Sequence, residues 1–403
     1  MLTSVGVPVI PETEPSEPDP SPTLVCFSHL RWDFVFQRPQ HLMSRFAHEM
    51  KVVFWEEPLE IEPRETAYLK VRQAGDYPNV RIATPHLPRG IDEAKRNAIL
   101  KRLLDAHVAI YAGPLVTWYY TPMMLPFSRH LDASAVVYDC MDELSKFRFA
   151  PERLLDLEQE LIGRADLVFT GGASLYEAKK GRHDSVHCFP SSVDREHFAK
   201  ARRELPQPDD QAKLRHPRLG FYGVIDERFD IDLLRQIADI RPDWSFVMVG
   251  PVVKIGEDEL PRAANIHYVG GRTYEQLPAY LSGWDVALMP FAMNESTQFI
   301  SPTKTPEYLA GGKPVVSTPV RDVVRTYGHL QGVHIASDAD GFIHCCEKAL
   351  RQSREGGDWL GEADLLLSAS SWKTTQARMS GLIAQVLGEG VDTTEPALLA
   401  AAE

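Results

Sequence analysis

Short apolar runs alternate with amphipathic stretches of helical length along most of the chain. Runs of about four to eight β-branched and aromatic residues predict buried strands, and apolar positions recurring every three or four residues predict helices between them. This alternation is typical of βαβ units, in which helices cover a sheet of parallel strands. The pattern therefore predicts an α/β protein with parallel sheets.

The predicted elements fall into two series separated by a break. Strands of the first series are predicted at Leu24 to His29, Lys51 to Trp55, Val80 to Thr84, Val108 to Ala112, Ala135 to Asp139, Leu167 to Thr170 and Val186 to Phe189. Its helices are predicted at Gln37 to Glu49, Asp92 to Ala106, Pro151 to Arg164 and Leu175 to Lys180. Strands of the second series are predicted at Leu219 to Val224, Ser245 to Val249, Ile266 to Val269, Val286 to Pro290, Pro314 to Ser317 and Val333 to Ile335. Residues 202–218 between them are charged, punctuated by proline and poor in apolar side chains, which predicts a linker.

The break indicates how the chain divides into domains. A length of 403 residues suggests two or three domains at roughly 150 residues each, and the two series of elements favour two. We expect Rossmann-like, doubly wound domains at residues 24–205 and 206–370, facing each other across a cleft. Residues 1–23 are rich in proline and acids and lack lysine and arginine. We predict a disordered tail there and a second tail at 391–403.

Charge and composition exclude several kinds of partner and site. The formal net charge of -13 excludes nucleic acid as the main partner, because phosphate backbones are bound by Lys and Arg. The five cysteines show no CxxC spacing, so they suit a reducing compartment and indicate neither a disulfide framework nor a zinc site. No apolar run approaches the roughly 20 residues that cross a bilayer, and the N-terminus lacks signal-peptide order. We predict a cytoplasmic protein, and the basic stretch Lys95 to Arg102 leaves peripheral membrane contact open.

The segment SPTKTPEYLAGGKPVVST, residues 301–318, carries the clearest candidate chemistry. It predicts a helix that opens near Pro302, closes at two glycines and leads into a buried strand. Lys304 lies near the helix N-terminus, where a cation opposes the macrodipole unless an anion is bound. Glu307 lies on the same helical face. The segment therefore indicates an anion site, and an ordinary surface ion pair of Lys304 with Glu307 is the alternative.

The segment GFYGVIDERFDIDLL, residues 220–234, has the form of a strand, a glycine turn and a helix. Gly223 at the strand end would let the backbone approach a diphosphate, and the helix N-terminus would face it. A plain strand-to-helix turn is the alternative. Asp230 and Asp232 have the DxD spacing that binds a divalent ion in some sugar transferases, but acids that open a helix usually act as caps. We predict no metal site and no cofactor.

Several segments occur in an order that resembles a known family. FVMVGP, NIHYVGGRTYEQLPAYL, WDVALMPF and PEYLAGGKPVVST in the second half are similar to the nucleotide-binding domain of GT-B glycosyltransferases, close to the retaining glycosyltransferase family 4. ADLVFTGGASLYEAKK and VHCFPSSVDREHF in the first half fit the same family. FSHLRWDFVFQRPQHLMSRFA and VVYDCMDELSKF resemble bacterial glycosyltransferases of the surface polysaccharide and teichuronic acid type. The resemblance spans about Leu24 to Leu387 and implies the GT-B fold.

The resemblance implies roles for residues of the second domain. Glu307 would hydrogen-bond the ribose or the donor sugar, Lys304 would meet the diphosphate, and Arg228 would neutralise the diphosphate leaving group. Gly250 would lie close to the nucleoside, and Gly270 with Arg272 would form the base-recognition turn. The implied donor-binding set is Gly223, Arg228, Gly250, Gly270, Arg272, Lys304 and Glu307.

The sequence also departs from the family pattern. The family has a second glutamate eight residues before the position of Glu307, where this chain has Phe299. The arginine that usually follows the first glycine of this domain is replaced by Val224. These departures leave the identity of the donor and part of the catalytic assignment open.

Two loops of the first domain would face the cleft, since each follows a predicted strand. SHLRWDFVFQRPQHL, residues 28–42, offers cationic side chains for an anionic group of donor or acceptor, with a solvated loop as the alternative. Its candidate residues are His29, Arg31, Arg38 and His41. YDCMDEL, residues 138–144, presents Asp139 and Asp142, which we predict to orient or deprotonate the acceptor hydroxyl. Acids after a strand also commonly cap helices.

The function we expect is glycosyl transfer. A sugar would move from a nucleotide-diphosphate donor, with a UDP-sugar favoured, to a glycan or lipid-linked acceptor in cell-envelope polysaccharide synthesis, with retention of configuration. A GT-B-fold sugar-nucleotide epimerase and a non-catalytic sugar-nucleotide-binding protein remain alternatives. An NAD-dependent oxidoreductase is disfavoured because no GxGxxG follows a strand. The last helix, residues 371–390, resembles the segment that crosses back to the first domain. The expected catalytic residues are Asp139, Asp142, Arg228, Lys304 and Glu307.

Overall fold

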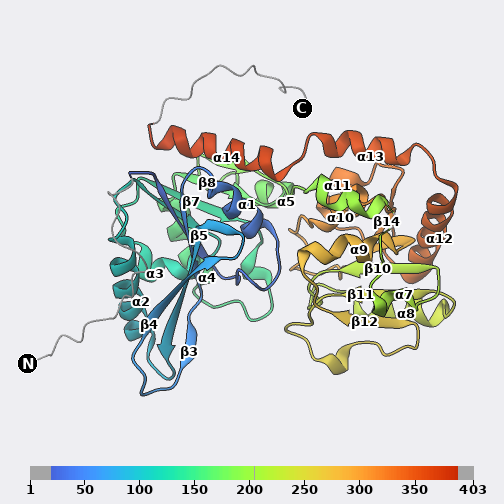
Figure 1. The fold of residues 1–403 in the computed structure, drawn as a ribbon, viewed down its shortest axis with the longest axis horizontal. Coiled ribbons are helices and arrows are strands. Elements are labelled where there is room, and N and C mark those ends of the chain that lie inside the picture. Colours follow the sequence, from blue (N-terminus) through green and yellow to red (C-terminus); the bar gives the residue numbers. More distant parts are fainter. Residues whose placement is uncertain (1–19, 204, 389–403) are drawn as a thin grey trace, which may run out of the picture.

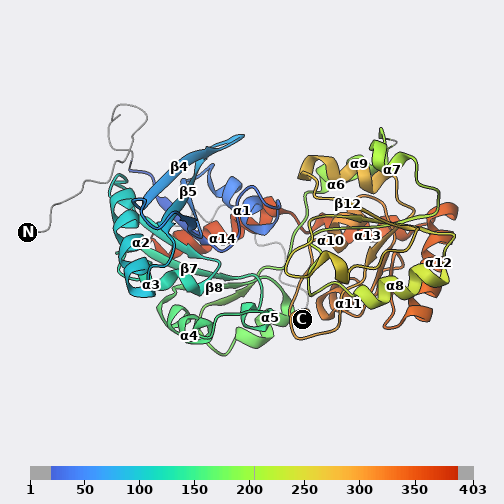
Figure 2. The ribbon, with the colours of Figure 1, turned by 90° about the horizontal axis from the view of Figure 1, so that it is seen from below.

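The computed structural model describes residues 20–203 and 205–388 and shows two α/β domains side by side (Figures 1 and 2). Both are built on parallel sheets, as the alternation of apolar runs predicts. The predicted C-terminal tail and residues 1–19 of the predicted N-terminal tail lie outside the described residues, and the first strand already begins at Thr23. Within the described ranges, no helix combines the length and the apolar character needed to cross a bilayer.

The first domain is organised around a nine-stranded sheet with the order β3-β5-β2-β1-β6-β7-β8-β9, in which β4 pairs with β5. All these strands are parallel except β4, which runs antiparallel to β5. The strands are β1 (Thr23–Ser28), β2 (Lys51–Glu56), β3 (Leu59–Ile61), β4 (Tyr68–Ala74), β5 (Tyr77–Pro88), β6 (Leu115–Tyr119), β7 (Ala135–Cys140), β8 (Leu167–Thr170) and β9 (Val186–Cys188). The helices of this half are α1 (Arg38–Phe46), α2 (Glu93–Val108), α3 (Leu125–Ser128), α4 (Leu154–Arg164), α5 (Ala173–Lys179) and α6 (Arg195–Ala199).

The second domain has a six-stranded sheet with the order β12-β11-β10-β13-β14-β15. Its strands are β10 (Arg218–Tyr222), β11 (Ser245–Val249), β12 (Ile266–Gly270), β13 (Val286–Met289), β14 (Val315–Ser317) and β15 (Val333–Ile335). The remaining helices are α7 (Asp209–Ala212), α8 (Ile231–Ile240), α9 (Leu277–Ser282), α10 (Lys304–Ala310), α11 (Arg321–Tyr327), α12 (Ala339–Glu355), α13 (Trp359–Ser368) and α14 (Trp372–Val386). In each sheet the strand order reverses next to the first strand, β1 or β10. Ligands of doubly wound sheets usually bind at the carboxyl ends of the strands at such a reversal point.

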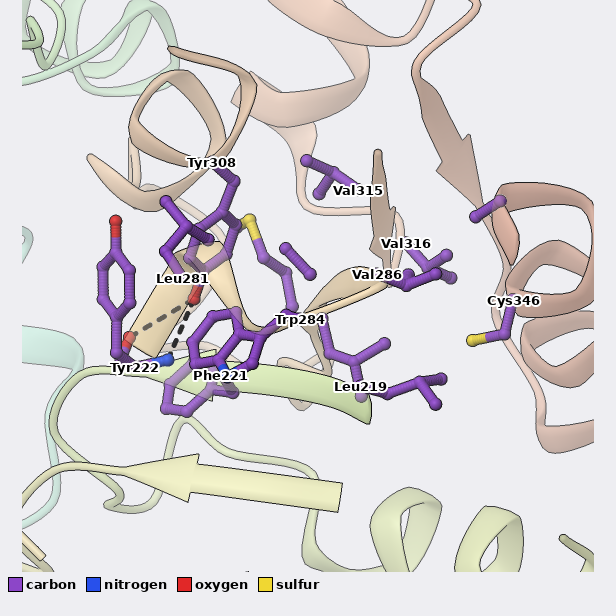
Figure 3. Close-up of a cluster of buried hydrophobic side chains, with 14 of the residues drawn as sticks. Leu219, Phe221, Tyr222, Leu281, Trp284, Val286, Tyr308, Val315, Val316 and Cys346 are labelled. Carbon is purple, nitrogen blue, oxygen red and sulfur yellow. Dashed lines mark hydrogen bonds between the residues drawn. The ribbon is translucent and has the colours of Figure 1, made fainter. Parts of the chain in front are cut away.

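Both faces of the first sheet are buried, which explains why its strands read as nearly continuous apolar runs. Alternate residues of β1 enter different cores: Leu24 and Cys26 pack on one face, and Val25 and Phe27 on the other. The second domain has one large core, part of which is shown in Figure 3. There Trp284 and Leu281 pack against Tyr308, whose hydroxyl lies beside the backbone of Tyr222.

The predicted strand at Val108 to Ala112 is wrong. α2 continues to Val108, and the strand of this region is β6, at Leu115–Tyr119. Ile110, which made the earlier run look apolar, is 63% exposed. β6 is instead buried between β1 and β7, with which it pairs in parallel. A central strand needs apolar side chains on both faces, and β6 meets that requirement.

The hairpin of β4 and β5 was not predicted. β4 is antiparallel and mostly exposed, and charged Lys70 and Arg72 interrupt its apolar positions. A half-exposed edge strand of this kind gives a weak periodic signal. The turn between the two strands, residues 74–77, nevertheless reaches the cleft between the domains.

The chain passes between the domains earlier than the boundary expected at residue 205. Val193, Phe198 and Ala201 are buried in the core of the second domain, so α6 packs there. The segment predicted as a linker also carries structure: in α7, Gln211 is fully buried and accepts a hydrogen bond from Trp284 Nε1 at 2.8 Å. The chain returns through α14, which lies along the first domain (Figure 1) and buries Trp372 in its core.

Candidate functional site

A cavity of about 630 Å³ lies between the two domains. The first domain contributes residues 32–37, which follow β1, and residues 74–77 from the hairpin turn. The second domain contributes the loops after β10, β11 and β12 and the start of α10. The walls therefore come mainly from the carboxyl ends of parallel strands, as expected for this type of sheet. The volume lies within the range of small-molecule sites.

Lys304 begins α10 and lines the cavity, as its position in the sequence predicted. Its ammonium lies 5.6 Å from the ring centre of Phe221 and 5.7 Å from that of Phe291. Among the residues that the structure describes, no carboxylate forms an ion pair with it. Burial and the nearby charge of Arg228 lower the pKa of Lys304 to about 8. A buried cation of this kind is stabilised when an anion binds beside it.

Glu307 lies one helical turn after Lys304 and lines the same cavity. Its residue is 6% exposed, and burial raises the pKa of its carboxyl group. The Tyr222 hydroxyl donates a hydrogen bond of 2.8 Å to Glu307 Oε2. Tyr222 is fixed in turn, because its backbone N–H donates to the Tyr308 hydroxyl at 3.0 Å (Figure 3). The half-buried Lys304 and the buried Glu307 thus both line the cavity and do not form a solvated surface ion pair.

Arg228 follows β10 and lines the cavity from the same domain. Its Nε donates to Asp226 Oδ1 at 2.9 Å, and its Nη2 donates to Asp226 Oδ2 at 2.6 Å. Burial alone would lower the pKa of Arg228, but the hydrogen bonds and charge of Asp226 raise it above its ordinary value. The bidentate pair holds the guanidinium in a fixed plane. Asp226 was not among the predicted site residues, although it lies in the same short loop.

Two glycines allow the backbone to come close at the cavity wall. Gly223 has φ +139°, and a Cβ there would lie 2.3 Å from Lys304 Cε. Gly250 has φ +147°, and a Cβ there would lie 1.8 Å from the carbonyl oxygen of Gly223. A side chain at either position would be strained and would displace its neighbour. Both glycines line the cavity.

Of the two residues predicted to form the base-recognition turn, Arg272 lines the cavity and Gly270 does not. Arg272 lines it, but its guanidinium donates to the Tyr280 hydroxyl at 2.6 Å and to Asp210 Oδ2 at 2.5 Å. Gly270 ends β12 and does not line the cavity, whereas the next residue, Gly271, does. Arg272 therefore anchors the turn to α7 and α9.

A smaller cavity of about 100 Å³ adjoins the first at Arg228 and Lys304. Asp142 lines it from the first domain. Burial raises the pKa of Asp142 to about 6, and the charge of Arg228 opposes that shift. Its carboxylate accepts no side-chain hydrogen bond from the described residues, so it is available to a ligand.

Asp139 does not face either cavity, which corrects its predicted placement beside the acceptor. The residue is fully buried, and Arg38 Nε and Nη2 donate to its two oxygens at 3.0 and 2.8 Å. Arg38 Nη1 also donates to the carbonyl oxygen of Phe189 at 2.7 Å. This ion pair joins α1 to β7. It leaves Asp139 unavailable to an acceptor hydroxyl, and it engages the guanidinium of Arg38 that was expected to bind an anionic group. Arg38 also lines the smaller cavity.

The other residues predicted in the loop after β1 do not line the large cavity either. Arg31 donates to Glu56 at 3.1 Å. His41 is buried and stacks on Trp372 with ring centres 4.7 Å apart. Burial and Lys254 lower the pKa of His29 to about 4, so it is neutral at physiological pH. The loop reaches the cavity through residues 32–37 instead, which include the aromatic Trp32 and Phe36 and the polar Asp33 and Gln37.

Sequence reasoning missed several aromatic residues of the site. Tyr274 lines the cavity from the second domain, and its ring lies 4.8 Å from that of Phe36 in the first domain. His197 stacks on the other side of Tyr274 at 4.2 Å. Tyr77 comes from the hairpin that was not predicted. Tyr274 lies in the quoted segment NIHYVGGRTYEQLPAYL, shortly after a predicted strand, which was the available signal for it.

The proposed cap at the start of α8 is confirmed. The Asp230 side chain accepts from the backbone N–H of Leu233 at 2.9 Å. Asp232 pairs with Arg235 on the exposed face of the same helix. Neither carboxylate lines one of the two cavities.

Comparison with known proteins supports the resemblance found in the sequence. Residues 216–352 match the family described as glycosyl transferases group 1. A Bacillus subtilis protein, TuaH, whose name assigns it to teichuronic acid biosynthesis as a glycosyltransferase, is 30% identical over 260 residues. That match covers 59% of this chain and 64% of the relative, so it takes in slightly less than two thirds of the relative's length.

Solved structures share the fold across almost the whole chain. Sucrose-phosphate synthase from Thermosynechococcus elongatus superposes with a TM-score of 0.68 at 15% identity, covering 92% of this chain and 100% of the other. The Anabaena protein HepE, solved in complex with UDP, has a TM-score of 0.62 at 13% identity and covers 91% of this chain and 100% of its own. The predicted arrangement of two Rossmann-like domains is confirmed.

Proposed function

We propose that this chain, a GT-B-fold protein whose residues 216–352 match the group 1 glycosyltransferases, moves a sugar from a nucleotide-diphosphate donor to a glycan or lipid-linked acceptor. The observation that carries the proposal is the convergence of Lys304, Arg228 and Glu307 on one wall of a cavity between two domains. Two cations and a buried carboxylate at this wall match the diphosphate and the hydroxyl groups of such a donor. The proposed pathway is cell-envelope polysaccharide synthesis.

The leaving group of this reaction is a diphosphate that gains negative charge as the glycosidic bond breaks. Lys304 and Arg228 would stabilise that charge, since both are partly desolvated and Arg228 is held rigid by Asp226. Because these two cations supply the positive charge, we propose that transfer needs no divalent metal. The resemblance to the retaining glycosyltransferase family 4 favours retention of configuration.

Glu307 would accept hydrogen bonds from hydroxyl groups of the ribose or the donor sugar. Its Oε2 is already held by Tyr222, so the carboxylate is oriented before the donor arrives. Phe299, at the position of the family's second glutamate, contacts the core of the first domain. Of the family's two glutamates, this chain therefore retains only Glu307 to bind the donor.

The smaller cavity is the proposed acceptor side, because it adjoins the two cations and opens onto the first domain. Asp142 is its candidate base, since a carboxyl group with a pKa of about 6 is largely ionised at neutral pH yet more basic than an exposed aspartate. In a retaining transfer the donor phosphate can also take the acceptor proton. Asp142 would then orient the hydroxyl instead.

The names of two similar proteins support a particular product and donor for this chain. The Bacillus subtilis relative carries the name of a teichuronic acid biosynthesis glycosyltransferase, which supports an envelope polysaccharide as the product. The Anabaena structure holds UDP, which supports a UDP-linked donor. We propose a cytoplasmic location, where nucleotide-sugar donors are made, and peripheral membrane contact through the exposed α2 residues Lys95, Arg96 and Arg102.

The two alternative functions differ from the proposed one in whether the donor is turned over and whether turnover needs an acceptor. A sugar-nucleotide epimerase would turn over the donor without an acceptor, and a binding protein would not turn it over at all. Neither is favoured by the comparisons. Donor turnover measured with and without acceptor separates the three.

The decisive experiment is a turnover assay of the purified chain with a panel of nucleotide sugars and an envelope-glycan acceptor, run with and without EDTA. We expect release of a nucleoside diphosphate that depends on acceptor and is unaffected by EDTA. Lys304→Ala and Glu307→Ala should each lower turnover by at least about tenfold with little change in Tm. Lys348→Ala, on the exposed face of α12, is the matched control.

Turnover without acceptor, or loss of folding in both variants, would contradict the proposal. Full inhibition by EDTA that added Mg²⁺ reverses would contradict its metal-independent form.

A further inference from the structure

Phe147 reaches from the first domain to the arginine expected to meet the diphosphate in the second. It follows the short 3-10 turn Leu144–Lys146, five residues after Asp142. The guanidinium carbon of Arg228 lies 5.2 Å from the centre of its ring. We propose that Phe147 is a positioning residue, whose ring fixes Arg228 for the diphosphate when the two domains are closed.

Arg228 is held by contacts from both domains. Asp226 binds its Nε and Nη2 at one edge, within the loop that carries both residues. That pairing fixes the plane of the guanidinium but leaves its face uncovered. The Phe147 ring lies within cation–π distance, where the negative face of an aromatic ring attracts a cation. Arg228 therefore has one partner in its own domain and one across the cleft.

The same ring also interacts with a second cation of the second domain. Lys254 Nζ lies 4.9 Å from the Phe147 ring centre and 3.4 Å from Glu227 Oε1. Lys254 has φ +64°, a conformation that side-chain-bearing residues seldom adopt and that persists only when surrounding contacts hold it. Asp226 already pairs with Arg228, and Glu227 pairs with Lys254, so the ring adds a further favourable contact to each of two paired cations at the edge of the cleft.

A neighbouring ion pair also crosses the cleft, directly beside Phe147. Lys146 Nζ lies 3.2 Å from Glu295 Oε2 across the cleft. Both groups are largely exposed, so the pair contributes little by itself. It does show that residues 146 and 147 cross the cleft together. Opening the domains would withdraw the ring from Arg228 and Lys254 at the same time.

The inference rests on the proposed function, because it assigns Arg228 to the diphosphate. It adds that the first domain completes the phosphate site through a hydrocarbon ring that never touches the donor. The Asp142 loop and the Arg228 loop would then be set together, so the acceptor side and the leaving-group side are organised by one closure.

The test uses UDP as the probe and four proteins: the unaltered chain, Phe147→Ala, Phe147→Tyr and Phe149→Ala. Phe149 is two residues away in the same loop and 81% exposed, which makes it the matched control. Calorimetric titration should show UDP binding weakened roughly 3- to 20-fold in Phe147→Ala. Phe147→Tyr, which keeps the ring, should stay within about twofold of the unaltered chain, and Phe149→Ala should not change.

A second measurement needs no ligand. In a double-mutant cycle on Tm, Phe147→Ala and Arg228→Ala together should lower Tm by less than the sum of the single changes, because each removes the same contact. UDP binding by Phe147→Ala equal to that of the unaltered chain, a Phe147→Tyr variant as weak as Phe147→Ala, or additive Tm losses would overturn the inference. If the unaltered chain binds no nucleoside diphosphate, the proposed function fails, and the cycle still decides whether Phe147 holds Arg228.

Discussion

Two ionisable side chains at the cleft have pKa values moved toward neutrality, one from each domain. Burial raises the pKa of Asp142 to about 6 and lowers that of Lys304 to about 8. The shifts have one physical cause, because removing water disfavours the charged form of either group. Perturbed groups that meet in a cleft are typical of sites where charge changes during function.

The raised pKa of Asp142 predicts how the rate of transfer depends on pH. If Asp142 accepts the proton of the acceptor hydroxyl, it must be ionised, so kcat/KM should fall as the pH drops through about 6. Asp142→Asn should lower the rate by about 100-fold and remove this acidic limb of the pH profile. The measurement is the pH dependence of kcat/KM for both proteins.

Glu152→Gln is the control for Asp142→Asn, since Glu152 is an exposed carboxylate of the first domain ten residues further along the chain. An Asn variant that keeps both its rate and the acidic limb would show that another group, such as the donor phosphate, accepts the proton.

At the scale of elements, α14 connects the two domains. It follows α13, which packs in the second domain, but its own apolar residues Trp372, Met379 and Ile383 are buried in the core of the first. Polar contacts fix its register on α1 and the segment after it: Gln376 Nε2 and Ser380 Oγ donate to Glu49 at 3.0 and 2.5 Å. The helix therefore belongs by packing to the domain that is distant in sequence.

Trp372→Ala should destabilise the first domain by about 3–5 kcal/mol, because it removes a buried indole that stacks on His41 and leaves a cavity. Calorimetry should show a lower Tm for the variant than for the unaltered chain. Lys373→Ala, exposed in the same helix turn, should leave the transition within error. Equal Tm values for Trp372→Ala and the unaltered chain would mean that α14 does not support the first domain.

At the scale of the whole molecule, short polar contacts join the domains next to the cavity. Asp322 at the start of α11 accepts from the backbone N–H of Ser174 at 3.0 Å and from its hydroxyl at 2.5 Å. Ser191 Oγ donates to the carbonyl oxygen of Ser301 at 2.6 Å. Figures 1 and 2 show α5 and α11 meeting where the two sheets approach each other. These contacts set the domain arrangement that the cavity requires.

Asp322→Ala should loosen this arrangement, because the N–H of Ser174 loses its buried acceptor. We expect a larger radius of gyration in solution scattering and UDP binding weakened about fivefold. Ser174→Ala removes one of the contacts without altering α11 and should give a smaller change of the same sign. Asp340→Ala, exposed at the start of α12, is the control. An unchanged radius in Asp322→Ala would contradict this role.

The sequence alone determined the alternation of strands and helices and the parallel sheets, and it singled out the segment from Pro302 to Gly311 as a candidate anion-binding helix. These are local properties. Apolar periodicity reports burial on one or both faces, and a lysine at a helix N-terminus or a glycine at a strand end has a physical reason within a few residues. For that reason the local sequence indicates Lys304, Glu307 and Gly223 as site residues, and the family resemblance adds Arg228 to them.

Only the tertiary structure decided which polar residues near the strands reach the cavity. Asp139 and Asp142 are only three residues apart. Both oxygens of Asp139 accept hydrogen bonds from Arg38 of α1, whereas Asp142 lines the smaller cavity. The partners of a charge, and the ring of Phe147 against Arg228, come from segments far apart in the chain. Such pairings depend on how the domains and the crossing helix pack, which no local pattern of residues encodes.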